Sequence, residues 1–205
     1  MDKPNDLSAL RSATVLGMFA VIGLGLVTMI YQGTQAKIAA NKRAILSSTL
    51  HELVPDERFD NDIVTDYIIL QDDKPSNIDV PFKVYRARKN GIPVAGVIEV
   101  VAPDGYNGAI SLLIGVNMDG TLTGVRVVSH RETPGLGDDI EVNRSDWVLQ
   151  FTGLSRENTN QEKWKVKRDG GVFDQFTGAT ITPRAVVKAV YRSLIFFSTN
   201  KNSLF

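Results

Sequence analysis

The residues with the clearest potential for chemistry lie between Asp174 and Arg184, in the segment DQFTGATITPR. Thr182 is expected to cap a helix here, because Pro183 suits the first helical position. The small residues ahead of it form a loop that enters a helix N-terminus, where free backbone N–H groups and the helix dipole attract a phosphate. Arg184 in the first turn opposes that dipole unless it pairs with an anion. The pattern predicts a phosphate site, with an ordinary capped helix as the simpler interpretation.

A second candidate site is a loop that directly follows an expected strand and consists of Glu132, Thr133, Pro134, Gly135, Leu136 and Gly137. Its proline and two glycines would expose backbone amides in a constrained loop. Those amides could hydrogen-bond the edge of a flat heterocycle, while Leu136 packs on its face. The simpler interpretation is a strand-to-helix turn. The glycines do not form a dinucleotide fingerprint, because the third glycine and the following helix pattern are missing.

Other side chains with chemical potential are few. His130 lies beside Arg131 and could form an acid–base pair, although a single histidine at a strand end is more often structural. Tyr106 lies in an expected turn that could place it near a cofactor, whereas Trp147 and Trp164 are expected in the core. We therefore expect no catalytic side chain of the acid–base kind.

The composition excludes several classes of site. The 205 residues include no cysteine and two histidines, which excludes a disulfide framework, a thiolate nucleophile and iron–sulfur clusters held by cysteine. With so few histidines, a metal site is not expected. Lys+Arg and Asp+Glu both number 23, so no excess of positive charge would attract nucleic acid. If the chain carries electrons, it must use an organic cofactor.

An uncharged segment near the N-terminus predicts a membrane anchor. Ala13–Tyr31 contains nineteen residues without a charge, and a helix of that length spans about 28 Å, close to the hydrocarbon core of a bilayer. A cleavable signal peptide would have a shorter apolar core, and a buried helix is rarely apolar on all faces. We expect a short tail in residues 1–11, a transmembrane helix in 12–32 and an amphipathic connecting helix in 33–56. Positive charges flank the span on both sides, so the charge bias does not decide its orientation.

Residues 57–205 are expected to form one α+β domain with a largely antiparallel sheet and flanking helices. An Asn-Gly pair at 90–91 predicts a hairpin turn, and a second hairpin turn is expected at 117–120. The predicted elements are strands at 63–70, 83–88, 93–102, 109–116, 121–129, 163–168 and 172–176, a short helical end at 147–151 and a last helix at 183–198.

Together these features resemble RnfG, the FMN-binding G-subunit of the Rnf (also called Rsx) electron transport complex. The resemblance covers essentially the whole chain, with an N-terminal span, a Glu-Thr-Pro-Gly-Leu-Gly loop near mid-chain and an Asp-x-x-Thr-Gly-Ala-Thr pattern ahead of a C-terminal helix. In that family the last pattern is the recognition sequence of a flavin transferase, which joins FMN through its phosphate to the final threonine. The resemblance implies one covalent FMN on Thr180, in a recognition loop completed by Asp174, Thr177, Gly178 and Ala179.

The same resemblance assigns cofactor-binding roles to further residues of both candidate sites. Thr182 and Arg184 would hold the phosphate at the helix N-terminus. The loop 132–137 would contact the isoalloxazine ring through Glu132, Thr133, Gly135, Leu136 and Gly137. The soluble domain, residues 57–205, would then be the FMN-binding domain.

The resemblance implies a flavoprotein subunit that carries electrons and is not catalytic alone. It would be a single-pass protein of the bacterial inner membrane with its domain in the periplasm. Its partners would be the flavin transferase and the other membrane, iron–sulfur and flavin subunits of a complex that couples electron transfer to ion movement.

The sequence leaves three alternatives open. The related C-subunit of the sodium-translocating NADH:quinone reductase is usually longer, and its loop more often begins with serine, so Thr177 and the chain length favour RnfG. An extracytoplasmic anchored binding or scaffold module would have no redox role. An FMN-dependent reductase acting alone would need its own substrate pocket, for which the sequence has no fingerprint.

Overall fold

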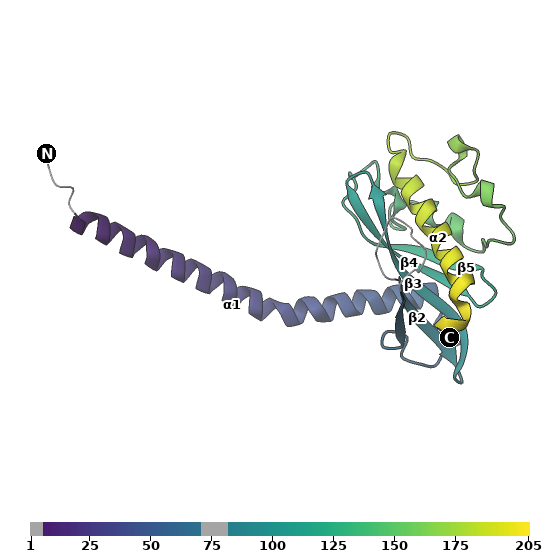
Figure 1. Cartoon of the computed structure of the whole chain (residues 1–205), viewed down its shortest axis with the longest axis horizontal. Coiled ribbons are helices and arrows are strands. Elements are labelled where there is room, and N and C mark those ends of the chain that lie inside the picture. Colours follow the sequence, from purple (N-terminus) through teal and green to yellow (C-terminus); the bar gives the residue numbers. More distant parts are fainter. Residues whose placement is uncertain (1–5, 71–81) are drawn as a thin grey trace. The chain divides into compact units, whose positions relative to one another are not determined.

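The computed structural model describes residues 6–70 and 82–205, and the chain divides into two compact units (Figure 1). The boundary between the units falls between Ile45 and Leu46. The first unit is helical, and the second contains the sheet, the short 3-10 helices and the C-terminal helix.

Helix α1 (Asp6–Leu53) is continuous, and the side chains of residues 9–45 are all exposed. By its length and composition it is apolar enough to cross a membrane. The hydroxyl groups of Thr14, Thr28 and Thr34 donate to backbone carbonyls of the preceding helical turn, at 2.7–2.9 Å. Hydroxyl groups that bond within their own helix need no partner from a hydrocarbon environment. The helical segments predicted at 12–32 and 33–56 lie in one continuous helix, which ends at Leu53 and not at residue 56.

The last turns of α1, from Leu46 onward, belong to the second unit and pack against the sheet. Leu50 and Leu53 are buried in a small cluster with Tyr85 and Val97, and Leu46 packs against its edge. Within the amphipathic helix predicted at 33–56, the apolar residue Ile38 is exposed.

The domain is built on a five-stranded antiparallel meander. The strands are β1 (Tyr67–Leu70), β2 (Phe82–Lys89), β3 (Ile92–Gly105), β4 (Gly108–Asn117) and β5 (Leu122–Ser129), and they pair in the order of the chain. Asn90 and Gly91 both have positive φ, 53° and 78°, as a two-residue hairpin turn between β2 and β3 requires. The α+β class and the antiparallel sheet are thus confirmed.

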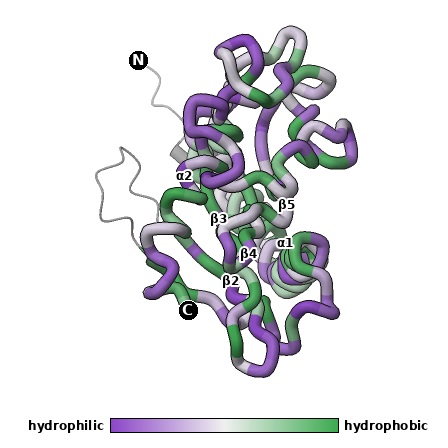
Figure 2. The backbone as a smooth tube through the Cα atoms, turned by 90° about the vertical axis from the view of Figure 1, so that its right-hand side faces the viewer, coloured by the Kyte–Doolittle hydropathy of each residue, from purple (hydrophilic) through white to green (hydrophobic). Residues whose placement is uncertain are grey.

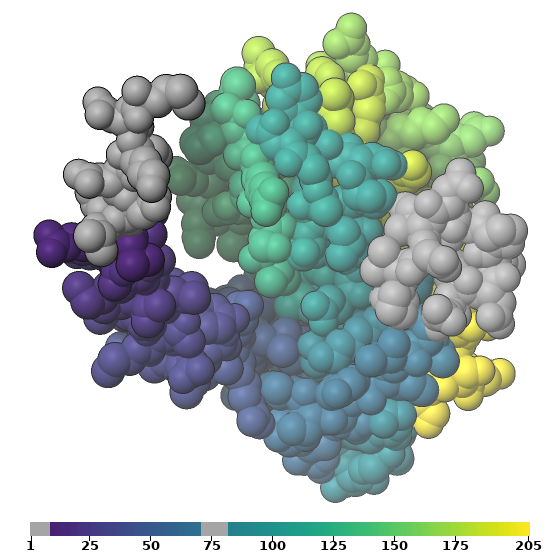
Figure 3. All heavy atoms as spheres, turned by 60° about the vertical axis from the view of Figure 1, so that its left-hand side comes forward, coloured from purple at the N-terminus to yellow at the C-terminus, as the bar shows by residue number. Residues whose placement is uncertain are grey.

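The two faces of the sheet are covered by different helices. Alternating residues such as Val84, Ile98 and Leu112 point into the main core, which also contains the buried side chains of α2 (Ile181–Leu204). Their neighbours on the opposite face form the small cluster with the end of α1. Figure 2 shows hydrophobic stretches along the strands and hydrophilic residues in many of the outer turns. Figure 3 shows one side of the molecule, where the teal residues of the strands form a broad surface.

Several predicted elements differ from those observed. The strand expected at 63–70 is reduced to β1, because Asp62 O accepts from the amides of Thr65 and Asp66 and so makes a turn. The prediction of strands at 163–168 and 172–176 is wrong. That region contains the 3-10 helices η4 (Gln161–Lys163) and η5 (Lys167–Asp169) and a single bridge between Val166 and Phe173.

The remaining short elements are 3-10 helices. They are η1 (Asp56–Arg58), η2 (Asp138–Ile140) and η3 (Asp146–Phe151). The last of these contains the helical end expected at 147–151. Trp147 and Trp164 are 4% and 5% exposed, which confirms their place in the core.

Candidate functional site

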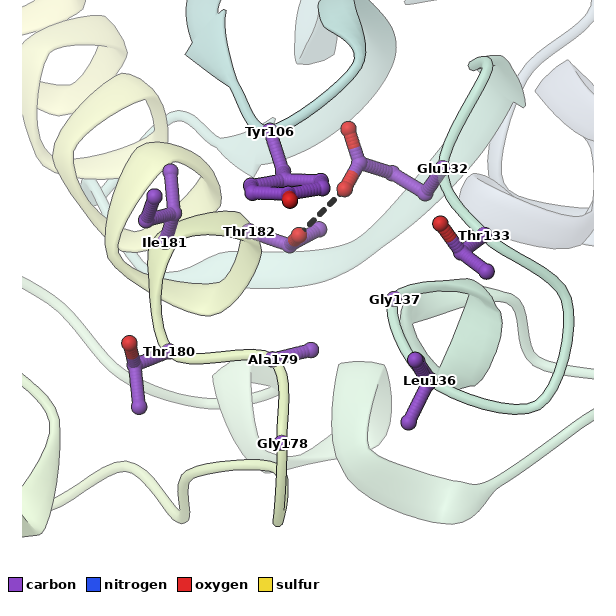
Figure 4. A pocket seen from close by; sticks show the side chains of 10 residues that line it. All are labelled: Tyr106, Glu132, Thr133, Leu136, Gly137, Gly178, Ala179, Thr180, Ile181 and Thr182. Carbon is purple, nitrogen blue, oxygen red and sulfur yellow. Dashed lines mark hydrogen bonds between the residues drawn. The ribbon is translucent and has the colours of Figure 1, made fainter.

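The two candidate loops meet around one cavity, although 45 residues separate Glu132 from Thr177 in the sequence. The cavity has a volume of about 220 Å³ and lies between the loop after β5, the β3–β4 turn and the start of α2 (Figure 4). It is lined by Tyr106, Glu132, Thr133, Leu136, Gly137, Gly178, Ala179, Thr180, Ile181 and Thr182.

A buried carboxylate joins the three elements that form the cavity. Glu132 is 5% exposed, and its Oε2 accepts a short hydrogen bond from the hydroxyl of Thr182, which is fully buried. Its Oε1 accepts from the backbone N–H of Asn107 in the β3–β4 turn, at 3.1 Å. The Asn107 side chain in turn donates to Thr133 Oγ1 at 3.1 Å. These bonds fix the loop, the turn and the helix start relative to one another.

The amides of Gly135, Leu136 and Gly137 already donate to acceptors in the loop or directly after it. Gly135 N donates to Asp138 Oδ1 at 2.6 Å, and the amides of Leu136 and Gly137 both donate to Thr133 O at 3.1 Å. The prediction that these amides are free to bond the edge of a heterocycle is therefore wrong. Leu136, 42% exposed, instead offers its side chain to the cavity.

A tight turn brings residues 178–180 to the lining of the cavity, whereas Thr177 does not line it. Ala179 N donates to Phe176 O at 3.4 Å, and Gly178 at its apex has a φ of +84°, which side-chain-bearing residues rarely adopt. A Cβ on Gly178 would lie 3.2 Å from Leu136 Cδ2, so the glycine also leaves space beside the other loop. In Figure 4 the methyl group of Ala179 points towards Leu136, whereas the Thr180 side chain points to the other side of the turn.

Helix α2 begins two residues earlier than predicted. Thr180, not Thr182, occupies the N-cap position, and its hydroxyl makes no capping hydrogen bond. The hydroxyl of Thr182 instead lies inside the first turn and bonds Glu132. The predicted N-cap role of Thr182 is therefore wrong, and the Thr180 hydroxyl lies at the positive end of the helix dipole.

Two charged residues of the candidate segment have partners away from the cavity. Arg184 donates from Nε and Nη2 to the carboxylate of Asp169, at 2.6 and 2.8 Å. This bidentate pair lowers the pKa of Asp169 and raises the pKa of Arg184. Asp174 pairs with Lys167 and accepts from Gln150 Nε2 at 3.0 Å. Neither Arg184 nor Asp174 lines the cavity, so their cofactor-binding roles remain predictions.

His130 has hydrogen-bond partners at both ring nitrogens. Its Nδ1 accepts from Glu132 N at 3.0 Å, and its Nε2 lies 2.5 Å from Glu141 Oε1. This arrangement holds the base of the 132–137 loop, in agreement with a structural role. In the described part of the chain, no group of three or more His, Cys, Asp or Glu side chains could hold a metal ion.

Sequence reasoning missed the buried link between Glu132 and Thr182 and the contribution of Ile181 to the cavity. The first depends on a contact between residues 50 apart, for which a single sequence carries no signal. Ile181 is an apolar residue exposed to 44%, and its exposure is visible only once the start of α2 is known.

Comparison with known proteins decides the family. Residues 105–195 match the model of the FMN-binding domain, and residues 1–53 match that of the RnfG N-terminal region. The G-subunit of the ion-translocating oxidoreductase complex of Shewanella piezotolerans is 47% identical over 96% of this chain and 93% of its own. The chain belongs to the RnfG family.

Two further G-subunits of ion-translocating oxidoreductase complexes have the same extent of similarity. The protein of Pseudomonas aeruginosa is 46% identical over 100% of this chain and 95% of its own. That of Pseudoalteromonas atlantica is 45% identical over 95% of this chain and 91% of its own. The FMN-binding match covers the turn, both loops and most of α2, and therefore every residue that lines the cavity.

The residues of the cavity fit a flavin. Leu136, Ala179 and Ile181 offer apolar contacts for a flat ring system, and Tyr106 adds an aromatic side chain. Gly178 has no side chain to fill the space beside Leu136. Ligand sites of this kind combine mostly apolar walls with a few fixed polar groups, here Glu132 and Thr182.

Proposed function

We propose that this protein is a membrane-anchored flavoprotein subunit of an Rnf-type complex, with FMN joined by a phosphoester to Thr180. The observation that carries the proposal is the position of the Thr180 hydroxyl. Thr180 is one of the residues that line the cavity, and its hydroxyl lies at the N-terminus of α2, on the side of the turn away from Leu136, without a capping hydrogen bond.

The site also suits the phosphate that would remain on Thr180. A phosphodiester carries one negative charge, which the positive end of the α2 dipole stabilises. Arg184 lies one helical turn further on. Its guanidinium could donate hydrogen bonds to both Asp169 and the phosphate. Thr182 would act indirectly, since its hydroxyl holds Glu132.

The attachment requires an activated flavin donor and an enzyme. The Thr180 oxygen forms a bond to the FMN phosphorus of a flavin dinucleotide, and the pyrophosphate bond breaks. A nucleoside monophosphate leaves, and the hydroxyl proton is lost to solvent. No electrons are transferred in this step. A flavin transferase that recognises the segment from Asp174 to Thr180 would catalyse it.

The protein positions the flavin, and the flavin supplies the redox chemistry. Bound FMN would accept electrons from one subunit of the complex and pass them to another, and the complex would couple this transfer to ion movement. The chain's own residues anchor the cofactor at Thr180, pack its ring against Leu136 and fix the cavity through Glu132.

We expect the protein purified after expression with a flavin transferase to be yellow and to keep its flavin absorbance in denaturant. Expression without the transferase is the control and should give colourless protein. A colourless product with an active transferase would contradict the proposal and would favour the anchored scaffold module. The quinone-reductase C-subunit is disfavoured by the match to the RnfG N-terminal region and by the names of the relatives.

We further propose that α1 anchors the chain in the inner membrane with the domain in the periplasm. The exposed apolar surface of α1 supports the anchor, and the family resemblance supports the orientation, because the positive charges on both sides of the span do not decide it. Protease added to spheroplasts is expected to digest the domain without lysis. Digestion only after lysis would contradict the periplasmic orientation.

A further inference from the structure

Glu132 is a buried acidic residue that lines the cavity. Its carboxylate is 5% exposed and accepts two hydrogen bonds, one from a hydroxyl group and one from a backbone N–H. In the described part of the chain, no Lys, Arg or His side chain forms an ion pair with it. Figure 4 shows the carboxylate beside the ring of Tyr106 and the hydroxyl of Thr182.

The surrounding backbone is closely fitted to this carboxylate. A Cβ on Gly105 would lie 2.9 Å from Glu132 Oε1, and a Cβ on Gly137 would lie 2.8 Å from Oε2. Because neither glycine has a side chain, the main chain can lie close to both carboxylate oxygens of Glu132. Burial of an ionisable group costs free energy, so an amide or apolar side chain would suit a purely structural link better.

We propose that Glu132 is a positioning residue that sets the reduction potential of the flavin through its negative charge. This proposal rests on the proposed function, since it requires the flavin to occupy the cavity. The carboxylate lines the same cavity as Leu136 and Ala179, on which the ring would pack.

The physical reason is the unfavourable interaction between like charges. Added electrons make a flavin more negative, and a fixed negative charge in the cavity wall raises the free energy of the reduced form. Because the carboxylate is buried, solvent and salt screen this effect poorly. The hydrogen bonds from Thr182 and Asn107 withdraw charge from the carboxylate and so moderate the effect.

The substitution Glu132→Gln separates charge from shape. The amide oxygen of glutamine can still accept from Asn107 N, and its NH₂ can donate to the Thr182 hydroxyl, because a hydroxyl both donates and accepts. The link between the elements is retained while the charge is removed. Thr182→Val does the opposite, because it keeps the charge and removes one of its two donors.

The test is a redox titration of the flavin-loaded full-length protein, with the wild type and the variants at the same pH and ionic strength. We expect Glu132→Gln to shift the midpoint potential to a more positive value and Thr182→Val to shift it to a more negative value. Glu99→Gln is the control, because it removes an equal charge from a residue that does not line the cavity. The midpoint potential of the flavin in this variant should stay at the wild-type value.

Midpoint potentials that shift in the same direction in both variants, or in neither, would overturn the proposal. A residue that is only a structural link would give the same response whether its charge or its hydrogen-bond donor is removed. If Glu132→Gln does not fold, the shift of Thr182→Val still decides the result. If wild-type protein carries no covalent flavin, the function proposed above fails. Titration of FMN added to the same proteins then tests the charge effect separately.

Discussion

Replacing Thr180 with valine is expected to abolish covalent flavin completely. Valine has nearly the shape of threonine but no oxygen that could form the phosphoester. Because the Thr180 hydroxyl makes no capping hydrogen bond, we expect the free energy of unfolding to change by less than about 0.5 kcal/mol. In-gel flavin fluorescence after denaturation measures the covalent flavin.

Two controls accompany this variant. Thr180→Ser keeps a hydroxyl group and should retain some fluorescence. Thr199→Val changes an exposed threonine far along α2 and should remain fully fluorescent. Fluorescence that persists in Thr180→Val would show that the flavin is attached elsewhere, and the other threonine of the turn, Thr177, would be the next residue to replace.

Gly137→Ala is expected to have the largest effect on the architecture of the site. The new Cβ would lie 2.8 Å from Glu132 Oε2 and 2.9 Å from Glu132 Cβ, closer than real Cβ contacts allow, and a tight 3.1 Å from Thr182 Oγ1. Relief of this clash must move a buried carboxylate or the start of α2. We expect a loss of about 2 kcal/mol in the free energy of unfolding, as for other overpacked sites.

Denaturant unfolding of the domain measures this effect, and flavin incorporation should fall with it. Gly33→Ala is the matched control, because a Cβ there has no atom within 4 Å and lies in the exposed part of α1. Wild-type stability and normal flavin content in Gly137→Ala would mean that the contact between Glu132 and the first turn of α2 is not needed for the site.

Elements with a local cause could be predicted from the sequence. The hairpin at Asn90 and Gly91 follows from two residues that tolerate positive φ, and the first part of α1 follows from its long uncharged segment, which is mostly apolar. Both candidate loops were found for the same reason, since glycine and proline mark turns wherever they occur.

Features that depend on tertiary contacts could not be predicted. The start of α2 was placed two residues late, because Thr182 is a good capping residue and nothing local indicates that Glu132 binds its hydroxyl. The alternating residues of 163–168 resembled a strand, but the chain folds back so closely that a Cβ on Gly171 would lie 1.8 Å from Lys165 O. The internal bonding of the 132–137 amides was likewise invisible, because it depends on how the loop closes on Asp138.

The central claim is that Thr180 carries FMN, and the most direct test is the intact mass of the full chain expressed with a flavin transferase, followed by mapping of the modified peptide. We predict a mass increase of one FMN less one water, located on Thr180. An unmodified mass, or a flavin mapped to any other residue, would contradict the account.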